Sequence, residues 1–333
     1  MDAVVAGDVP AGGSARAGGF DEALGASSGR YFSSGYRRTQ YVFAPFDIAG
    51  DATAITGSVD VGYPADWSLK AGEPRSAHLS TIDALVASAA AAQEALAVLC
   101  GLNPEEISGA WFADLSIRAG ARALTDLEAV PIACRLVERG AESQWGVAAL
   151  HLTVGTFTVT ARVHHPWTNQ RPRTRRSGSF EPSSLGPSPY LSLFRTMEHD
   201  STITCIDVNG PTMDCVHRVI HDPRDDRPVG IESAYGPQPT LIDCLVLAGQ
   251  MLQVLVLATA GSSREGSGNL WMRRITFTST SPSRPSATRA RLTITGQRVI
   301  PRDHVVMHGV DARCEDLCGV TMAAQLAYTT EAE

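Results

Sequence analysis

The sequence lacks an excess of basic residues, a long uncharged apolar run and a paired-cysteine motif. Its 28 Lys and Arg against 35 Asp and Glu give a net charge of −7, which argues against binding nucleic acid through a basic face. The one basic run, residues 171–176, lies among Pro, Ser and Gly. This composition is typical of a solvated linker, with an anion or partner contact as the alternative. No stretch reaches the roughly 18 uncharged apolar residues of a membrane span, so we expect a soluble protein with neither nucleic acid nor membrane as a partner.

Cysteine usage and the N-terminal segment favour a cytoplasmic protein. The seven cysteines are odd in number and widely spread, as expected in a reducing compartment. Cys314 and Cys318 stand four apart with no histidine pair at ligand spacing, so we predict no metal site. No glycine loop of the P-loop or dinucleotide kind occurs, so we predict no cofactor. Residues 1–29 are rich in Ala, Gly and Ser without the features of a signal peptide, and we expect a disordered tail.

The chain contains an internal repeat with an offset of 243 − 83 = 160 residues. Residues 80–93 read STIDALVASAAAAQ, and residues 240–253 read TLIDCLVLAGQMLQ. Both copies carry apolar residues at the three- and four-residue spacing of a buried helix. Each copy therefore predicts one long helix. The identical pairs are Ile82/Ile242, Asp83/Asp243, Leu85/Leu245, Val86/Val246 and Gln93/Gln253.

Alternating β-branched residues predict two strands before each helix and four after it. A helix that is apolar over most of its girth must be covered on several sides, which an antiparallel sheet curved around it achieves. The predicted fold is therefore α+β, a double hot-dog. The predicted strands are residues 41–46, 54–61, 111–117, 131–138, 146–154 and 157–164 in the first half, and 202–208, 215–220, 270–278, 290–296, 304–310 and 320–328 in the second.

Composition also divides the chain. Residues 30–165 form the first predicted hot-dog and residues 190–333 the second, with residues 166–189, rich in Pro, Ser, Gly and Arg, as the linker between them. Because two fused hot-dogs can pair within one chain, we expect a monomer or a homodimer.

Polar residues at the two helix starts are the candidate catalytic groups. Asp83 and Asp243 lie just inside each start, where a carboxylate either lines a cleft or only complements the helix dipole. His78 and Gln238 each stand five residues earlier. An imidazole can remove the acidic proton between two carbonyls, whereas an amide can only bind or orient; the alternative for His78 is a structural hydrogen bond. We expect His78 and Asp243 to reach one cleft, with the pKa of Asp243 raised if that cleft is dry.

A loop flanked by Gly and Pro precedes the first predicted helix. It carries Tyr63, Asp66, Trp67 and Lys70. A lysine can hold a phosphate or a hydroxyl-bearing substrate, and a tryptophan can form the wall of a pocket. We therefore predict that these four residues and Gln238 contact the substrate. The alternative is that the loop residues are ordinary surface side chains without a functional role.

Two sets of motifs resemble known families. Residues 238–243, QPTLID, resemble the His-Pro-x-Leu-Leu-Asp opening in the second hot-dog of polyketide synthase dehydratase domains, with glutamine in place of the motif's histidine. The ordered series YFSSGY at 31–36, DWSLK at 66–70, HLSTID at 78–83 and QPTLID is similar to the AvrD family, named for a bacterial avirulence protein. This second resemblance covers about residues 30–330.

The AvrD resemblance implies an enzyme that joins a β-ketoacyl thioester to a keto-sugar and makes a small signal of the syringolide or butenolide type. It implies small-molecule partners, with coenzyme A or a carrier protein holding the thioester. The dehydratase family places its catalytic His upstream of the first helix, but residues 60–70 contain none. Three functions remain open: a condensing or cyclising enzyme, a dehydratase or cyclase of a polyketide-like substrate, and a non-catalytic module that binds an acyl ligand.

Overall fold

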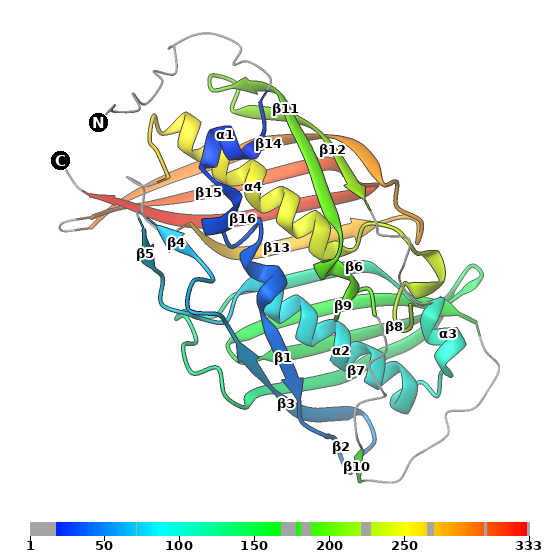
Figure 1. The fold of residues 1–333 in the computed structure, drawn as a ribbon. Coiled ribbons are helices and arrows are strands. Elements are labelled where there is room, and N and C mark those ends of the chain that lie inside the picture. The colour runs from blue at the N-terminus through cyan, green and yellow to red at the C-terminus, as the bar shows by residue number, and fades with distance from the viewer. Residues whose placement is uncertain are drawn as a thin grey trace.

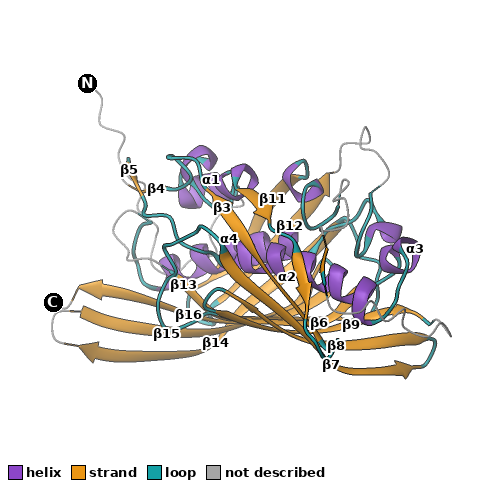
Figure 2. Cartoon of the chain, turned by 90° about the horizontal axis from the view of Figure 1, so that it is seen from below, coloured by secondary structure: helices purple, strands orange, loops and turns teal. Residues whose placement is uncertain are grey.

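Two long helices, α2 and α4, lie on the same face of one antiparallel sheet (Figure 1). Seen along the sheet, the strands form one layer and the helices the other (Figure 2). The computed structural model describes residues 18–70, 72–167, 178–180, 188–220, 228–264, 270–302 and 305–331. This arrangement, one long helix against an antiparallel meander, repeated once, confirms the predicted double hot-dog.

Helices α2 (Thr81–Leu99) and α4 (Leu241–Thr259) have the same length and differ in position by the repeat offset. Each begins with a capping box. Ser80 Oγ accepts from the Asp83 amide at 3.2 Å, and the Asp83 carboxylate accepts from the Ser80 amide at 2.6 Å. Thr240 and Asp243 repeat this exchange in α4. The Asp that recurs in both copies therefore fixes where each helix starts.

The sheet order is mirrored about its centre. The strands run β10-β2-β3-β7-β8-β9-β6-β13-β16-β15-β14-β12-β11, with β1 also on β3. Strands β6, β9, β8, β7 and β3 thus mirror β13, β16, β15, β14 and β12, whereas β10 has no counterpart. Antiparallel β6 and β13 join the halves, and Ser116 pairs with Thr276, its own equivalent 160 residues later. The pseudo-twofold axis of the repeat therefore passes through this pair.

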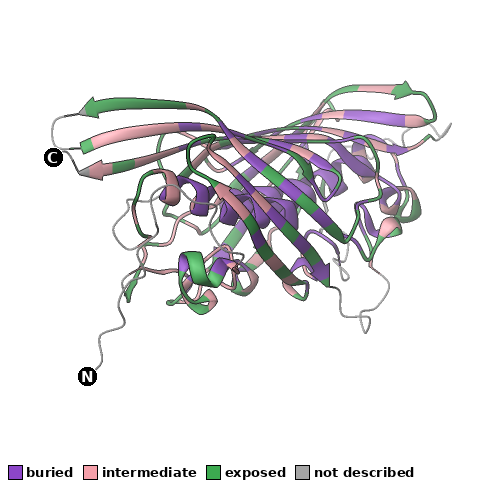
Figure 3. Ribbon diagram, turned by 90° about the horizontal axis from the view of Figure 1, so that it is seen from above, coloured by how far each residue is buried: buried purple, intermediate pink, exposed green. Residues whose placement is uncertain are grey.

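Most strands are longer than predicted, and β7, β14, β15 and β16 extend past the ends of the helices (Figure 2). The predicted strand 41–46 is instead divided between β1 and β2. Figure 3 shows burial concentrated under the helices and exposure at those strand ends. The strands are β1 Gln40–Phe43, β2 Phe46–Ile48, β3 Ala54–Gly62, β4 Leu69–Lys70, β5 Glu73–Pro74, β6 Trp111–Arg118, β7 Val130–Glu142, β8 Trp145–Val154, β9 Phe157–Pro166, β10 Ser179–Phe180, β11 Glu198–Asp207, β12 Thr212–Ile220, β13 Trp271–Ser279, β14 Ala287–Arg302, β15 Val305–Leu317 and β16 Val320–Glu331. The short helices are α1 Phe20–Leu24 and α3 Pro104–Ser108, with 3₁₀ turns at Ser27–Gly29, Gly35–Arg38, Leu193–Arg195 and Ser233–Tyr235.

Both long helices are core elements. By length and hydropathy alone, α2 and α4 could each cross a membrane, although both carry acidic residues, Asp83 and Glu94 in α2 and Asp243 in α4. In each case 89% of the apolar window is buried inside the protein. Their hydropathy is therefore explained by the sheet and loops that cover them.

The N-terminal segment differs from the predicted tail. Gly18 bridges to Ile203 on β11, and Phe20 and Leu24 of α1 are buried against the second half. Residues 18–29 therefore belong to the folded protein, because two apolar side chains on one helical turn pack beside α4. Residues 1–17 of the tail lie outside the described residues, as do 168–177 and 181–187 of the predicted linker. Within that linker, β10 pairs with β2.

We predict that the two halves unfold together, because they share one sheet and one contiguous apolar core. Leu85→Ala in α2 and Leu245→Ala in α4 each remove a fully buried side chain. Each should lower the free energy of unfolding by about 2–5 kcal/mol. Both should shift the same single transition in urea, followed by fluorescence and circular dichroism. Val137→Ala, at a position 64% exposed, is the control; two transitions, of which each variant moves only one, would contradict the prediction.

Candidate functional site

A cavity of about 490 Å³ opens between the two halves beside the start of α2. Ser80 and Thr81 reach it from the first turn of α2, while Gly249 and Gln253 reach it from the middle of α4. The β4–β5 hairpin and the start of β13, with Trp271, complete the wall. The amide groups of a helix's first turn point out of the helix, and its dipole is positive at this end. The cavity thus places a ligand where developing negative charge is stabilised.

The cavity wall is basic although the whole chain is acidic. Among the described residues, its lining includes six arginine or lysine side chains and no carboxylate. A wall with one sign of charge in a low-dielectric recess attracts ions of the other sign. The site therefore suits an anionic ligand. The six side chains are Arg30, Lys70, Arg75, Arg122, Arg264 and Arg273.

His78 lines the cavity between two tryptophans. Its ring lies 5.6 Å from that of Trp67 and 5.0 Å from that of Trp271, measured between centroids. Its Nδ1 lies 3.2 Å from the carbonyl oxygen of Ser76. Because a carbonyl can only accept, this contact holds the proton on Nδ1 and leaves Nε2 as the basic nitrogen.

Asp83 lies behind the cavity wall and is completely buried. Its carboxylate accepts hydrogen bonds from Tyr41, at 2.7 Å, and from Tyr63. Burial raises the pKa of Asp83, although the Tyr63 and Ser80 hydrogen bonds act in the opposite direction. Ser80 Oγ also lies 2.6 Å from the hydroxyl of Tyr31, which lines the cavity. A continuous chain of hydrogen bonds therefore joins Asp83 to the cavity surface.

The loop residues predicted to bind substrate separate into three places. Trp67 and Lys70 line the cavity. Tyr63 lies behind Trp67, with ring centroids 4.7 Å apart, and its hydroxyl donates a hydrogen bond to the Asp83 carboxylate. Asp66 does not line the cavity. Its carboxylate lies on the surface, where it accepts hydrogen bonds of 2.9 and 3.0 Å from the exposed guanidinium of Arg38.

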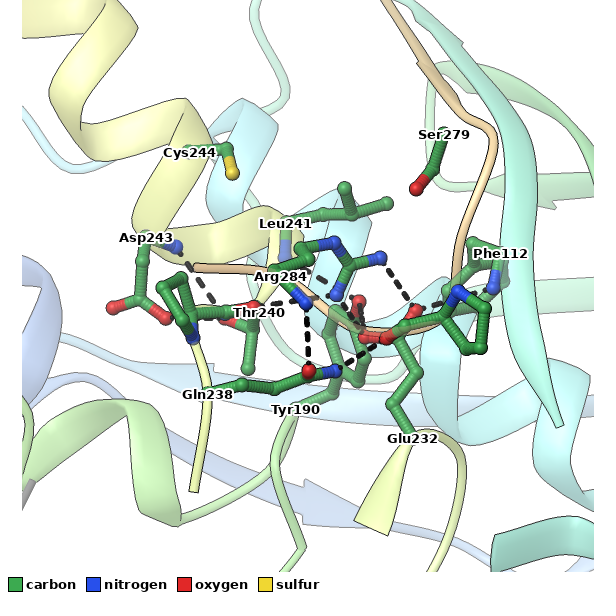
Figure 4. Close-up of polar contacts among 12 residues, drawn as sticks. Phe112, Tyr190, Glu232, Gln238, Thr240, Leu241, Asp243, Cys244, Ser279 and Arg284 are labelled. Atoms are coloured by element: carbon green, nitrogen blue, oxygen red, sulfur yellow. Dashed lines mark hydrogen bonds and ion pairs between the residues drawn. The ribbon is translucent and has the colours of Figure 1, made fainter. Parts of the chain in front are cut away.

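The corresponding region at the start of α4 is filled (Figure 4). Arg284 and Glu232 form an ion pair with both side chains at most 1% exposed, and one of its hydrogen bonds is 2.8 Å long. Tyr190 donates to Glu232 at 2.7 Å. Burial alone would lower the pKa of Arg284, but Glu232 raises it above its usual range. A charged pair thus occupies the space that the first half leaves open.

The equivalents of the cavity residues are consequently buried. Gln238, predicted to contact substrate, donates to the Pro282 carbonyl at 2.8 Å and accepts from the Arg284 amide at 2.9 Å. Gly230 has a φ of +92°, and a Cβ there would lie 2.2 Å from Gln93 Oε1. Only glycine fits this close approach in a left-handed conformation. The second site is closed by packing as well as by charge.

Asp243 lies in the closed half and meets a histidine other than the predicted one. His199 Nε2, on β11, is 2.8 Å from the Asp243 carboxylate. His217 lies 5.3 Å from the His199 ring, and burial lowers its pKa to about 3. Asp243 is absent from the described lining of the cavity that holds His78, so the structure does not bring this predicted pair together.

The pKa of Asp243 also differs from expectation. Burial acts to raise it, but the hydrogen bond and charge of His199, with the Thr240 hydrogen bonds, lower the pKa below its usual value. The pKa of Asp83, whose carboxylate is hydrogen-bonded to tyrosine hydroxyls, is instead raised by burial. Equivalent carboxylates therefore have opposite electrostatic environments because one faces an imidazole and the other faces tyrosines.

Sequence reasoning missed His199, the Glu232–Arg284 pair and the basic lining. The repeat offset does not point to His199, because the equivalent of Tyr41, the partner of Asp83, is Ser201, two residues further along β11. The partners in the other two groups come from distant loops and strands, and no local spacing indicates them.

We predict that Arg284→Met lowers the free energy of unfolding by about 3–5 kcal/mol, because it leaves the Glu232 carboxylate buried without its partner. Chemical denaturation at pH 7 measures the change. Arg291→Met, which breaks the exposed pair with Asp214, is the control and should change stability little. Equal effects of the two substitutions would contradict the prediction.

The two helix-start carboxylates should respond to acid in opposite ways. Asp243 has a folded-state pKa below its unfolded value, so its contribution is present above about pH 4 and is lost as the pH falls through the folded pKa. Asp83 has a raised folded pKa, so its contribution is present at low pH and is lost as the pH rises through that pKa.

We therefore expect the stability difference between wild type and Asp243→Asn to shrink from pH 6 to pH 3, in the range near and below the unfolded pKa of about 4. The difference for Asp83→Asn should grow over the same range. Urea unfolding at each pH tests both, and each variant is the control for the other. Parallel pH profiles would show that the two carboxylates share one environment.

Comparison with known proteins identifies the family. The family model for the Pseudomonas avirulence D protein (AvrD) matches residues 17–330. No curated protein matches the chain. Among solved structures it is similar to the tesB protein of Mycobacterium avium subsp. paratuberculosis, with 12% identity, a TM-score of 0.37 and coverage of 85% of this chain and 95% of that chain.

A second similar structure is the acyl-CoA thioesterase II TesB2 of Mycobacterium marinum, with 10% identity, a TM-score of 0.35 and coverage of 84% and 92%. A third is a hot-dog protein of unknown function from Alicyclobacillus acidocaldarius, with 10% identity, a TM-score of 0.37 and coverage of 88% and 96%. These scores are low, and the fold assignment rests on the chain's own topology. By the match over residues 17–330, the chain belongs to the AvrD family.

Proposed function

We propose that this protein is an enzyme that condenses a β-ketoacyl thioester with a keto-alcohol or sugar at the cavity beside α2. The observation that carries the proposal is the broken symmetry of the repeat. Of its two helix starts, the one at α2 meets a cavity with an imidazole and basic side chains, while the one at α4 is filled by a buried ion pair. The sequence resemblance to the AvrD family implies the same class of reaction.

His78 is the proposed general base. As the substrate hydroxyl attacks the thioester carbon, Nε2 takes the hydroxyl proton, and the new C–O bond forms. The C–S bond then breaks, and the imidazolium returns the proton to the leaving thiolate, so that the products are an ester and a thiol. The first-turn amides of α2 stabilise the oxyanion that exists between these steps.

The same groups support ring closure. The carbon between the two carbonyls of the ester is acidic, and the imidazole can remove its proton. The resulting carbanion attacks the ketone of the former alcohol, and the new alkoxide takes up the proton, which closes the ring without any other reactant. Removal of such a proton by a positioned side chain is a typical task of histidine.

The remaining residues position these groups. Trp67 packs beside His78, and the Asp83 carboxylate accepts hydrogen bonds from the Ser80 amide and the Tyr63 hydroxyl. Asp83 is thus a positioning residue for the α2 start. Asp243 and Gln238, bonded within the closed half, take no part in the proposed step. The basic lining attracts the anionic carrier of the thioester, whether coenzyme A or a phosphopantetheine group on a carrier protein.

We predict that purified protein releases thiol from β-ketoacyl thioesters only when a keto-alcohol is present, and forms a product with the combined mass less the thiol. Thiol release is followed with a thiol-reactive dye and the product by mass spectrometry. His78→Gln, which copies the residue of the closed half, should lower kcat by about 10²–10⁴-fold. His151→Gln, on the exposed side of β8, is the matched control.

Other outcomes would replace the proposal. Thiol release without an acceptor would identify a hydrolase, and loss of water from a 3-hydroxyacyl thioester would identify a dehydratase. Saturable acyl binding without turnover would identify a binding module. Wild-type turnover by His78→Gln would remove this residue from the mechanism.

A further inference from the structure

The start of α4 shows which kind of group fits the place that the cavity leaves open at the start of α2. Glu232 brings a carboxylate there; one oxygen accepts from the Tyr190 hydroxyl at 2.7 Å and the other from the Phe112 amide at 3.1 Å. Arg284 donates to the same carboxylate at 2.8 Å. A hydroxyl, a backbone amide and a guanidinium therefore converge on one planar, delocalised anion that the protein itself supplies (Figure 4).

Two of these donors have equivalents in the cavity wall. Phe112, near the start of β6, corresponds by the repeat offset, 272 − 112 = 160, to Met272 near the start of β13. Each residue directly precedes the β-bulge of its strand, and Met272 lines the cavity. Arg122 also lines the cavity, and it lies in the loop after β6 as Arg284 lies in the loop after β13.

Tyr31 is the equivalent of the third donor, Tyr190. It lines the cavity, and its hydroxyl lies 2.6 Å from Ser80 Oγ at the start of α2. The Tyr190 hydroxyl likewise accepts from the Leu241 amide at the start of α4 at 3.3 Å, and its own proton goes to Glu232. With Ser80 as the donor to Tyr31, the same arrangement leaves the Tyr31 proton for an acceptor in the cavity.

Among the described residues, no carboxylate lines the cavity in the way that Glu232 occupies the other helix start. In the loop before α2, Asp66 pairs with Arg38 on the surface, and Glu73 is exposed. The anion on which the donors at α4 converge therefore has no equivalent at α2, and a ligand can take its place.

Tyr31 stays protonated and lies near the proposed base. Burial and the charge of Asp83 raise the pKa of Tyr31 well above its usual value, against the opposing effect of its hydrogen bonds. The rings of Tyr31 and His78 both pack against Trp67, with centroids 5.0 and 5.6 Å from it. A neutral phenol donor and a basic imidazole thus adjoin the same part of the cavity.

We propose that the cavity binds the enolate of a 1,3-dicarbonyl compound where the other half holds the Glu232 carboxylate, and that Tyr31 donates to one enolate oxygen. The inference rests on the proposed function, whose β-ketoacyl substrate has a carbonyl group on each side of one carbon. When His78 Nε2 removes a proton from that carbon, the electron pair of the broken C–H bond delocalises over both carbonyl oxygens. The anion is then planar and shared between two oxygens, as a carboxylate is. Tyr31 is thereby a catalytic residue that stabilises this charge.

The first experiment measures enolate binding without turnover. Acetylacetone is a 1,3-dicarbonyl compound without a thioester, and its enolate is followed by ultraviolet absorbance during a pH titration. We expect the wild-type protein to bind the enolate in preference to the neutral compound. Tyr31→Phe, which removes only the hydroxyl, should weaken enolate binding by about 10- to 100-fold, the effect of losing a hydrogen bond to a charged group.

Further variants and a neutral ligand complete this experiment. Tyr31→Phe should bind 2-pentanone, which has one carbonyl, as the wild type does, and this binding shows that the cavity is intact. Arg122→Gln, on an exposed loop, should also weaken enolate binding. Tyr328→Phe, on β16 and outside the described lining, is the control and should bind both compounds as the wild type does.

The second experiment measures turnover. Tyr31→Phe should lower kcat for condensation of a β-ketoacyl thioester by about 10- to 100-fold with little change in KM, because the enolate forms only after the substrate has bound. A raised KM with unchanged kcat would show that Tyr31 contacts only the ground state and would overturn its catalytic role.

Failure of the inference and failure of the proposed function are separable. Equal enolate affinity of wild type and Tyr31→Phe, or no preference of the wild type for the enolate, overturns the inference, even if the protein condenses thioesters. Enolate binding that depends on Tyr31, without turnover of any thioester, overturns the function and leaves the site in place.

Discussion

The hydrogen bonding of β6 to β13 joins the two halves into one sheet, and the mutual position of α2 and α4 follows from it. Because Ser116 pairs with its own equivalent Thr276, the two units are related by an axis through the middle of the sheet. Each helix start is thereby brought toward the middle of the other helix. The cavity arises where the α2 start faces Gly249 and Gln253 of α4, so its existence depends on this register.

Symmetry of the backbone does not extend to the two sites. At the start of α2, His78, Trp67 and Trp271 surround a cavity, while at the start of α4 Glu232 and Arg284 fill the corresponding space. Desolvating an ion pair usually costs about as much as its attraction returns, so this pair is better explained by what it excludes than by stability. Among the described residues, the start of α2 therefore opens onto a cavity, while the start of α4 is occupied by the buried ion pair.

The sequence predicted the elements well and the side-chain partners poorly. Helices are set by local periodicity and capping, both visible in residues 80–93, and strands by alternation with turn residues between them. Partners such as His199 for Asp243, or Arg264 beside Arg30, depend on which strands and loops face each other. Those contacts join residues far apart in sequence, and no spacing rule applies to them.

The same contrast explains the electrostatics of the site. A net charge of −7 describes the average over the whole chain. It does not describe a cavity whose described lining includes six arginine or lysine residues contributed by both halves. A cavity wall with this sign of charge favours an anionic ligand over a neutral one. The basic lining of the cavity thus depends on the same register that joins the two units.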